Sequence, residues 1–401
     1  MTNDYDVIVV GGGLAGSTLA RSLAGNGARV LVLERERACR DRVRGELVQP
    51  WGVVEARSLG VYELLKQTCG YEVRWRLSQI YGAPPAEPRD LIATTPHRAG
   101  SLHFPHPDMQ EVLLDACVRA GATVQRGVRV VKVVPGSKPA VYVDPDQGGP
   151  FYARLVVGAD GRTSSCRKWG RFPVQRDPEG MQIAGVVVTG VATPEDAVRI
   201  FINPARGEVA LLIPLGGGRF RSYAGYYPEE RRSRLSGPEA LSDFLEACVS
   251  AGVPPEALST VQAAGPLASF DCTENWVPHP YQAGVVLVGD AAAVSNPVFG
   301  CGLSLALRDV RVLSSLLTSE PDWNKAADAY AEEHDRYFGT LHRLLGWMIQ
   351  LFYERGQQAA DLRKRAFARL AEDPARAPDF AGLGPDCPSD QAAYYNLFGE
   401  A

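Results

Sequence analysis

The first 34 residues constrain the fold more than any other part of the chain. The apolar run Val7–Val10 predicts a buried strand, and the sequence GGGLAG at residues 11–16 follows it with the spacing G-x-G-x-x-G. A helix is expected over Ser17–Ala24, and a second strand, Val30–Leu33, ends on Glu34. A strand, a glycine turn, a helix, a second strand and an acid in this order predict a dinucleotide-binding βαβ unit.

Each of these residue types has a physical role. Gly11 permits a tight turn, Gly13 lets backbone amides approach a pyrophosphate at the helix N-terminus, and Gly16 lets the helix pack closely on the strand. Glu34 can accept hydrogen bonds from a ribose diol and would repel a 2′-phosphate. We expect an ADP-containing dinucleotide here; the alternative is a glycine-rich turn that binds no ligand.

Two further segments combine a strand, a glycine turn and a helix start. In one, Leu155–Val157 precede the turn Gly158–Gly161. In the other, the apolar run 284–288 leads into GDAAAVSNPVFGCG at residues 289–302, and a helix is expected from Leu303. A plain strand-to-helix loop needs only a few residues, so the longer loop, with its proline and glycines, is typical of backbone that approaches a ligand.

Composition excludes several classes of protein. A net charge of −4 over 401 residues, without a long basic cluster, argues against nucleic-acid binding. The eight cysteines are scattered, which favours reduced thiols and no metal site, and the acidic N-terminus lacks the pattern of a signal peptide. We therefore expect a cytoplasmic protein without a membrane-spanning segment, in which the run 341–353 forms an amphipathic packing helix.

With these three motifs in this order, the sequence resembles the single-component FAD-dependent monooxygenases of the para-hydroxybenzoate hydroxylase type. The motifs are the N-terminal G-x-G-x-x-G with its acid, Asp160-Gly161, and Gly289-Asp290 with its proline and glycines. The short run RGELVQP at 44–50 is also similar to squalene monooxygenases. The resemblance covers roughly residues 5–350.

The resemblance implies an α/β fold. It comprises a Rossmann-like FAD-binding domain of the GR2 type, an interleaved β-sheet substrate domain and C-terminal helices. We expect the FAD-binding domain at 1–175 plus 276–330, the substrate-binding sheet at 176–275 and the helical segment at 331–401.

In the family, the aspartate of the third motif bonds the ribityl chain of FAD, and the following helix directs its positive end at the flavin ring. Carried over residue by residue, the resemblance implies a set of cofactor-binding residues: Gly11, Gly13, Leu14, Ala15, Gly16, Glu34, Arg35, Arg44, His106, Val130, Asp160, Gly161, Asp290, Pro297, Gly300, Gly302 and Leu303.

Several of these assignments leave alternatives open. For Asp290 and Asp160 the alternative is a helix-capping role. For His106 it is a surface or capping histidine, because the family often has arginine or glutamine near that position. Arg42 is the solvated alternative to Arg44. Cys301 stands where many members have glutamine, and we expect an inert small residue there.

The middle of the chain predicts the sheet that covers the flavin. Strands are expected at 197–202, 208–215 and 220–227, with a hairpin turn at Gly216–Gly218. The central strand carries no charge, and an ionised substrate in an apolar pocket would need a paired charge, so we expect a neutral hydrophobic substrate. Arg219 and Arg221 are candidates for charge at the rim, and the apolar residues are equally consistent with a plain core.

The function implied by the resemblance is hydroxylation or epoxidation of a hydrophobic small molecule. NAD(P)H, as a transient reductant without a domain of its own, reduces FAD, and molecular oxygen then gives a flavin C4a-hydroperoxide. The alternatives are a flavin-dependent reductase or oxidase of prenyl-type or polycyclic substrates, a halogenase, for which no W-x-W-x-I-P segment is present, and a non-enzymatic FAD protein. We assign no catalytic acid or base, and expect a monomer or homodimer.

Overall fold

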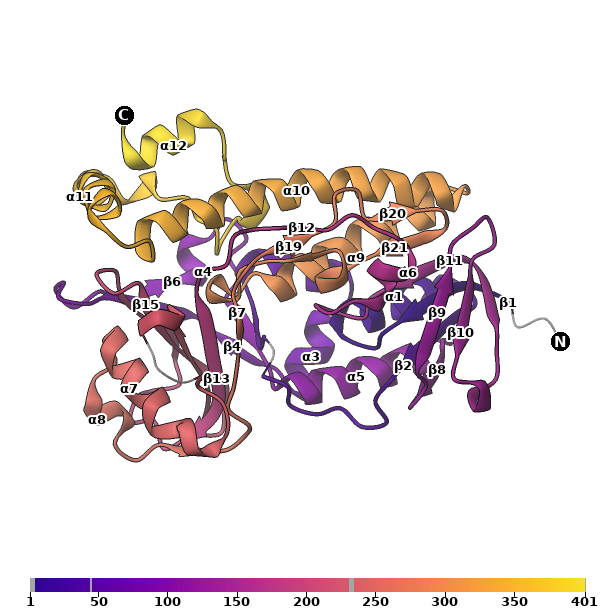
Figure 1. Cartoon of the computed structure of the whole chain (residues 1–401), viewed down its shortest axis with the longest axis horizontal. Helices are drawn as coiled ribbons and strands as arrows, with labels where there is room; N and C mark the ends of the chain where they lie inside the picture. The colour runs from indigo at the N-terminus through magenta and orange to yellow at the C-terminus, as the bar shows by residue number, and fades with distance from the viewer. Residues whose placement is uncertain (1–3, 44, 231–233, 401) are drawn as a thin grey trace.

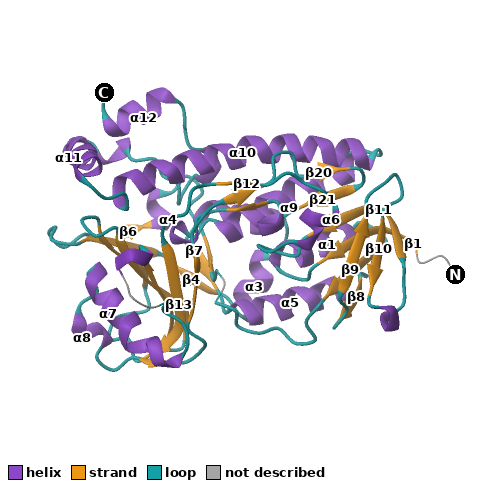
Figure 2. Cartoon of the chain, in the orientation of Figure 1, coloured by secondary structure: helices purple, strands orange, loops and turns teal. Residues whose placement is uncertain are grey.

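The computed structural model describes residues 4–43, 45–230 and 234–400. Two sheets lie at opposite ends of the molecule, with helices between them and a long helix along one side of both (Figure 1). Figure 2 shows most of the strands in these two groups, with a few short strands between them. The expected α/β fold is confirmed.

The first sheet is built on the N-terminal βαβ unit. Its neighbouring strands are parallel along β21, β11, β1, β2 and β8. Among the described residues it contains eight strands. Six follow the order β20 (Tyr281–Gln282), β21 (Val285–Leu287), β11 (Phe151–Gly158), β1 (Asp4–Val10), β2 (Val30–Glu34) and β8 (Thr123–Arg126), while β10 (Ala140–Val143) pairs with β11 and β9 (Val130–Val134) pairs with β10.

Both faces of this sheet are covered, which explains why its central strands are continuous apolar runs. One face packs on α1 (Leu14–Gly25), α5 (His106–Arg119) and α9 (Gly302–Ser319), and α2 (Pro50–Ser58) and α3 (Tyr62–Thr68) lie beside these helices. The other face packs against β9, β10 and the short helix α6 (Ser165–Trp169).

The second sheet confirms the three strands expected in the middle of the chain. Its order is β17 (Gln262–Ala263), β13 (Gln182–Thr189), β16 (Arg219–Tyr226), β15 (Glu208–Gly216), β14 (Ala197–Asn203), β5 (Trp75–Ile80) and β6 (Arg89–Asp90), with β18 (Ala268–Asp271) beside β13. Gly216, Gly217 and Gly218 all have positive φ and form the expected hairpin turn between β15 and β16.

Strands β5 and β6 belong to this second sheet, although the sequence-based division placed residues 1–175 in the other domain. β5 pairs in parallel with β14, from Trp75 opposite Ala197 to Ile80 opposite Ile202. Its own residues alternate weakly in polarity, so only the pairing with a distant strand reveals where it lies.

One face of the second sheet packs on α7 (Leu241–Ala251) and α8 (Pro255–Leu258). The other face joins the loop before α9 and the helix α10 (Trp323–Phe352) in a single apolar cluster. The run 341–353 falls almost wholly within α10 and buries Leu341, Leu344, Leu345 and Leu351, as an amphipathic packing helix requires. No helix among the described residues has the length and apolarity needed to cross a bilayer.

Smaller elements complete the chain. Two three-stranded sheets are formed by β12 (Gln175–Arg176), β19 (Asn275–Trp276) and β22 (Ala293–Val294), and by β3 (Leu47–Val48), β7 (Ser101–His103) and β4 (Tyr71–Val73). The remaining elements are α4 (Leu91–Thr94), α11 (Gln357–Glu372), α12 (Gln391–Phe398), and the 3-10 turns η1 (Pro145–Gln147), η2 (Pro228–Glu230), η3 (Pro238–Ala240), η4 (Gly289–Ala291), η5 (Pro297–Phe299), η6 (Pro374–Arg376) and η7 (Gly384–Asp386).

Candidate functional site

The three glycine motifs meet at the carboxyl ends of β1, β11 and β21. Gly11 has φ +108°, and a Cβ there would lie 2.4 Å from the carbonyl oxygen of Ala159, the residue before Asp160. Gly289, with φ +60°, approaches Ala15, since a Cβ on it would lie 3.2 Å from the Ala15 methyl. Motifs that are far apart in the sequence therefore come into direct contact, as neighbouring parallel strands require.

The glycines at the start of α1 play different roles. A Cβ on Gly16 would lie 2.0 Å from the Gly11 carbonyl oxygen, so Gly16 allows the helix to pack against the turn. A Cβ on Gly13 would meet nothing within 4 Å, although Gly13 is the N-cap of α1. No side chain caps α1, and its first turn holds no acid. Free amides beside open space at a helix N-terminus fit the pyrophosphate of FAD.

Glu34 lies at the end of β2, where the sequence predicts it, and is 8% exposed. Its carboxylate accepts hydrogen bonds from the amides of Gly12, at 2.7 Å, and Glu36, at 2.8 Å. Glu34 thus holds the glycine turn in shape as well as presenting an acid at the expected ribose position. The neighbouring Arg35 is exposed and pairs with Glu36.

Val130 begins β9, close to the end of β2, since the amide of Val128 donates to the carbonyl oxygen of Glu34. Val130 is half-buried and packs on the edge of the core beneath β2. Val130 therefore lies close to Glu34, and its contact with the cofactor stays a prediction.

Asp160 makes the contacts of a helix cap. Its carboxylate accepts hydrogen bonds from the amides of Ser165, at 2.7 Å, and Cys166, at 3.1 Å, and from the Ser164 hydroxyl, at 2.6 Å. Gly161 follows with φ +79°. The capping alternative therefore accounts for the hydrogen bonds of Asp160, and a contact with flavin remains a prediction.

The loop before α9, residues 289–302, has a distinctive pattern of exposure. Within the segment 284–310, nearly every residue is buried. The residues that keep accessible surface are the five predicted to contact the cofactor: Asp290, Pro297, Gly300, Gly302 and Leu303. The accessible face of this loop thus consists of those five residues, which lie before and at the N-terminus of α9.

Several polar groups that the sequence analysis missed hold this loop. Arg167 on α6 is 7% exposed and donates to the carbonyl oxygens of Asp290, at 2.5 Å, and Ala291, at 2.6 Å. Gln49 donates its side-chain amide to the carbonyl oxygen of Phe299 at 2.8 Å, and its backbone amide to the Ser304 hydroxyl at 2.9 Å. Gln49 lies in the RGELVQP run, but nothing local assigns it this role.

Two buried carboxylates accept hydrogen bonds from amides of the same loop. Asp309 accepts from Gly289 at 2.7 Å, and Glu274 accepts from Asn296 at 2.6 Å. Burial raises the pKa of Asp309, and it raises that of Glu274 to about 7. The sequence alone could indicate Asp309, because it is the lone acid in the apolar helical run after Leu303. No local sequence pattern points to Glu274.

His106 is the first residue of α5 and is 7% exposed, so its assignment as a surface histidine is wrong. Its Nδ1 lies 3.1 Å from the carbonyl oxygen of Gly45, and Gly45 in turn faces Leu303. Arg44 lies outside the described residues. Arg42 pairs with Glu36 and is partly exposed, in line with the solvated alternative.

The sequence makes Arg221 a candidate for charge at the rim of the sheet. In the structure Arg221 is instead buried, with 1% of its surface exposed. Its Nε donates to Glu46 at 2.9 Å, and its Nη2 donates to Asp41 at 2.7 Å. Glu46 also accepts from the Tyr223 hydroxyl at 2.7 Å, and burial raises its pKa to about 7. This cluster ties β16 to the segment before β3. Arg219 is exposed.

Two positions of this loop, Cys301 and Ala293, hold small buried residues. Cys301 is fully buried at the N-cap of α9, and burial raises the pKa of its thiol to about 12, so the expected inert role is supported. Ala293 pairs with Trp276 in the sheet of β19 and β22.

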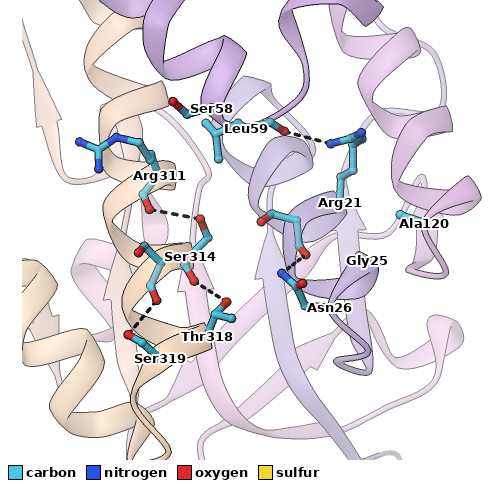
Figure 3. Close-up of a pocket in the computed structure, with 12 residues that line it drawn as sticks. Arg21, Gly25, Asn26, Ser58, Leu59, Ala120, Arg311, Ser314, Thr318 and Ser319 are labelled. Atoms are coloured by element: carbon cyan, nitrogen blue, oxygen red, sulfur yellow. Dashed lines mark hydrogen bonds between the residues drawn. The ribbon is translucent and has the colours of Figure 1, made fainter.

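A separate pocket lies at the other end of α1 (Figure 3). It is lined by Gly25 and Asn26 at the C-terminal end of α1 and by Ser314 and Thr318 on α9, and Arg21 donates to the carbonyl oxygen of Leu59 beside it. At 1.5 Å per residue, roughly 15 Å of helix separates this pocket from the glycine turn, so it is not the dinucleotide site.

Comparison with known proteins agrees with this geometry. The family described as "FAD binding domain" matches residues 4–337. Squalene epoxidase 1 of Arabidopsis thaliana is 24% identical, and the match covers 96% of this chain and 72% of that protein. Menaquinone reductase of Mycolicibacterium smegmatis is 27% identical, and the match covers 86% of this chain and 84% of that protein. The crystal structure of p-nitrophenol 4-monooxygenase PnpA from Pseudomonas putida superposes with a TM-score of 0.78 at 17% identity, over 93% of this chain and 95% of that one, which shows a shared fold.

Proposed function

This chain belongs to the FAD binding domain family and is an FAD-dependent oxidoreductase of the monooxygenase group, and from that premise we propose that it hydroxylates or epoxidises a hydrophobic small molecule with NAD(P)H and O₂. The observation that carries the proposal is the accessible face of Asp290, Pro297, Gly300, Gly302 and Leu303. It adjoins an apolar sheet face.

The apolar side of the proposed site comes from the second sheet. Ile200 on β14 and Leu211 and Ile213 on β15 belong to the same apolar cluster as Val298 and Phe299 of the loop before α9. An apolar body bound between this loop and the sheet would be shielded from water, which favours oxygen transfer over side reactions.

FAD, when bound, supplies the transfer of electrons from NAD(P)H and the activation of O₂. The residues of this chain bind and orient it. The amides at the start of α1 and the carboxylate of Glu34 suit the ADP half, and Asp290 is placed for the ribityl chain. The N-terminus of α9 offers a partial positive charge where negative charge on the ring would develop.

The proposal also keeps the division of the chain into an FAD-binding domain, at 1–175 and 276–330, and a substrate sheet, at 176–275, with β5 and β6 added to the latter. The segment 331–401 covers both. NAD(P)H has no separate domain in this arrangement, so it would reach the flavin transiently from solvent.

A reductase of prenyl-type substrates is the second candidate. It is favoured by the similarity to menaquinone reductase, which covers 86% of this chain at 27% identity. The apolar sheet face suits a prenylated ring as well as it suits an alkene.

The test is to identify the released flavin and the product. We expect FAD, and not FMN, because Glu34 and the glycine turn are arranged for an ADP group. Asp290→Ala should lower FAD affinity by roughly 1–3 kcal/mol. With NADH or NADPH and a panel of apolar alkenes and phenols, O₂ uptake with gain of one oxygen atom in the product supports a monooxygenase. Gain of two hydrogens without O₂ uptake supports the reductase, and recovery of FMN alone contradicts both.

A further inference from the structure

Arg76 lies on β5, far in the sequence from residues 176–275, where the substrate-binding sheet is expected. In the sheet it is opposite Val198 of β14 on one side and Arg89 of β6 on the other. Directly opposed residues in a sheet share a face, and Val198 belongs to the apolar cluster that contains Val298 and Phe299. The side chain of Arg76 therefore lies on the face toward the loop before α9.

The surroundings of Arg76 place it beside that loop. Its guanidinium carbon is 5.1 Å from the ring centre of Phe380, which is 5.5 Å from that of Phe299. Phe299 in turn lies 5.8 Å from Tyr353. The charge of Arg76 acts on both Cys301 and Tyr353, opposing the rise that burial causes in their pKa values. Through Phe380 and Phe299, the guanidinium therefore lies near the loop that leads into α9.

Arg76 is a cation without a partner in the part of the chain that the structure describes. The nearby Asp379 is occupied by Arg89, which binds it through two hydrogen bonds of 2.8 and 2.7 Å. No hydrogen bond or ion pair joins Arg76 to another described residue, and none joins the Tyr353 hydroxyl to one. Arg221, a further buried arginine of this sheet, is paired with Glu46 and Asp41 and is not free for a ligand.

The missing partner has an energetic consequence. Arg76 keeps some accessible surface, yet desolvation lowers the pKa of its guanidinium, and the like charge of Arg89 lowers it further. The side chain thus keeps accessible surface although its charge is largely desolvated. An uncompensated charge in such a place is costly, so a ligand anion there would be stabilised.

We propose that Arg76 and the hydroxyl of Tyr353 form a subsite for a negatively charged oxygen group on an otherwise apolar substrate. The guanidinium supplies the charge and two parallel donors, Tyr353 supplies a third, and Phe299 and Phe380 border the apolar part. This inference rests on the proposed function, because it assigns the subsite to the substrate of that same site. It replaces the neutral substrate expected from the sequence by a hydrophobic acid or an acidic enol.

The experiment compares two probes of nearly equal shape, 2-naphthoate and naphthalene-2-carboxamide. Each is titrated into the FAD-loaded protein, and binding is measured by calorimetry and by the change in flavin absorbance. We expect the carboxylate to bind the wild type roughly tenfold or more tightly than the amide. Arg76→Gln should remove this preference and leave amide affinity unchanged, Arg76→Lys should keep part of it, and Tyr353→Phe should reduce it.

Arg219→Gln is the matched control, because it removes an exposed arginine of the same sheet and should keep the full preference. The inference is overturned if the wild type binds both probes equally, if Arg76→Gln at matched FAD content keeps the preference, or if Arg219→Gln also loses it. It is also overturned if 2′-AMP displaces the naphthoate, since the subsite would then serve a nucleotide phosphate. Neither probe needs to be turned over, so failure of oxygen insertion is detected separately.

Discussion

The guanidinium of Arg167 donates to the main-chain oxygen of Asp290 at 2.5 Å, which links the second glycine motif to the third. Its other nitrogens bind the Ala291 carbonyl and the Asn275 side chain, each at 2.6 Å. One buried side chain thus sets the position of the loop that carries the accessible face at α9. This arrangement leads to the first of four predictions.

Replacing Arg167 by methionine should weaken FAD binding roughly tenfold or more, because two buried carbonyl groups lose their donors and the loop is no longer held. The measurement is the dissociation constant for FAD by fluorescence titration of the apoprotein. Lys168→Met is the control, since Lys168 is exposed on the same helix and should leave the affinity unchanged. Equal affinities in the two variants would refute the role of Arg167.

Gly13→Ala should lose FAD while keeping its stability. The added methyl meets no protein atom within 4 Å, but it enters the space assigned to the pyrophosphate. Gly25→Ala, at the other end of α1, also meets nothing within 4 Å and should keep both FAD and stability. Thermal unfolding of the apoproteins and FAD titration separate the two effects. If Gly13→Ala bound FAD normally, the pyrophosphate would have to lie elsewhere.

Asp160→Ala should reduce the free energy of unfolding by roughly 0.5–2 kcal/mol, because Asp160 accepts hydrogen bonds from two amides at the start of α6. Anaerobic reduction by NADH and NADPH at matched FAD loading then tests the second role. A slower rate of reduction per bound flavin would show that Asp160 takes part in flavin reduction as well as capping α6. An unchanged rate would leave Asp160 as a cap alone.

Glu274 should make the protein less stable as the pH rises. Its pKa is raised from 4.5 to about 7 by burial, so the folded state binds its proton more tightly than the unfolded state. The stabilisation is complete below about pH 4.5 and is lost as the pH rises to about 7, a change of roughly 3 kcal/mol. In Glu274→Gln this part of the pH dependence should vanish.

The check for Glu274 is the difference in unfolding free energy between wild type and variant from pH 4.5 to 8, at constant ionic strength. Glutamine keeps an acceptor for the Asn296 amide, so the variant should fold. His342 adjoins this carboxylate, because its Nε2 lies 3.4 Å from Glu274 and 2.9 Å from Asp177. His342→Gln therefore serves as the second variant, and a constant difference for Glu274→Gln would contradict the prediction.

The glycine turns and the strands before them could be predicted because their signals are local. Gly11, Gly13 and Gly16 stand next to the strand and helix they join, and the five accessible residues of the loop before α9 follow one apolar run. Arg167 and Glu274 could not be assigned, because their partners are brought to them only by the pairing of distant strands. For the same reason Arg221 was expected at a rim but is buried against Glu46.

The parallel pairing of β5 with β14 has a consequence for synthesis of the chain. Strand β5 emerges from the ribosome well before β14, its partner, and β11 must likewise wait for β21. Each sheet thus keeps an open edge during synthesis, because the second sheet has all its strands only at residue 271 and the first only at residue 287. Exposed edges of this kind invite pairing with other chains, and the first sheet keeps such an edge until residue 287 has been made.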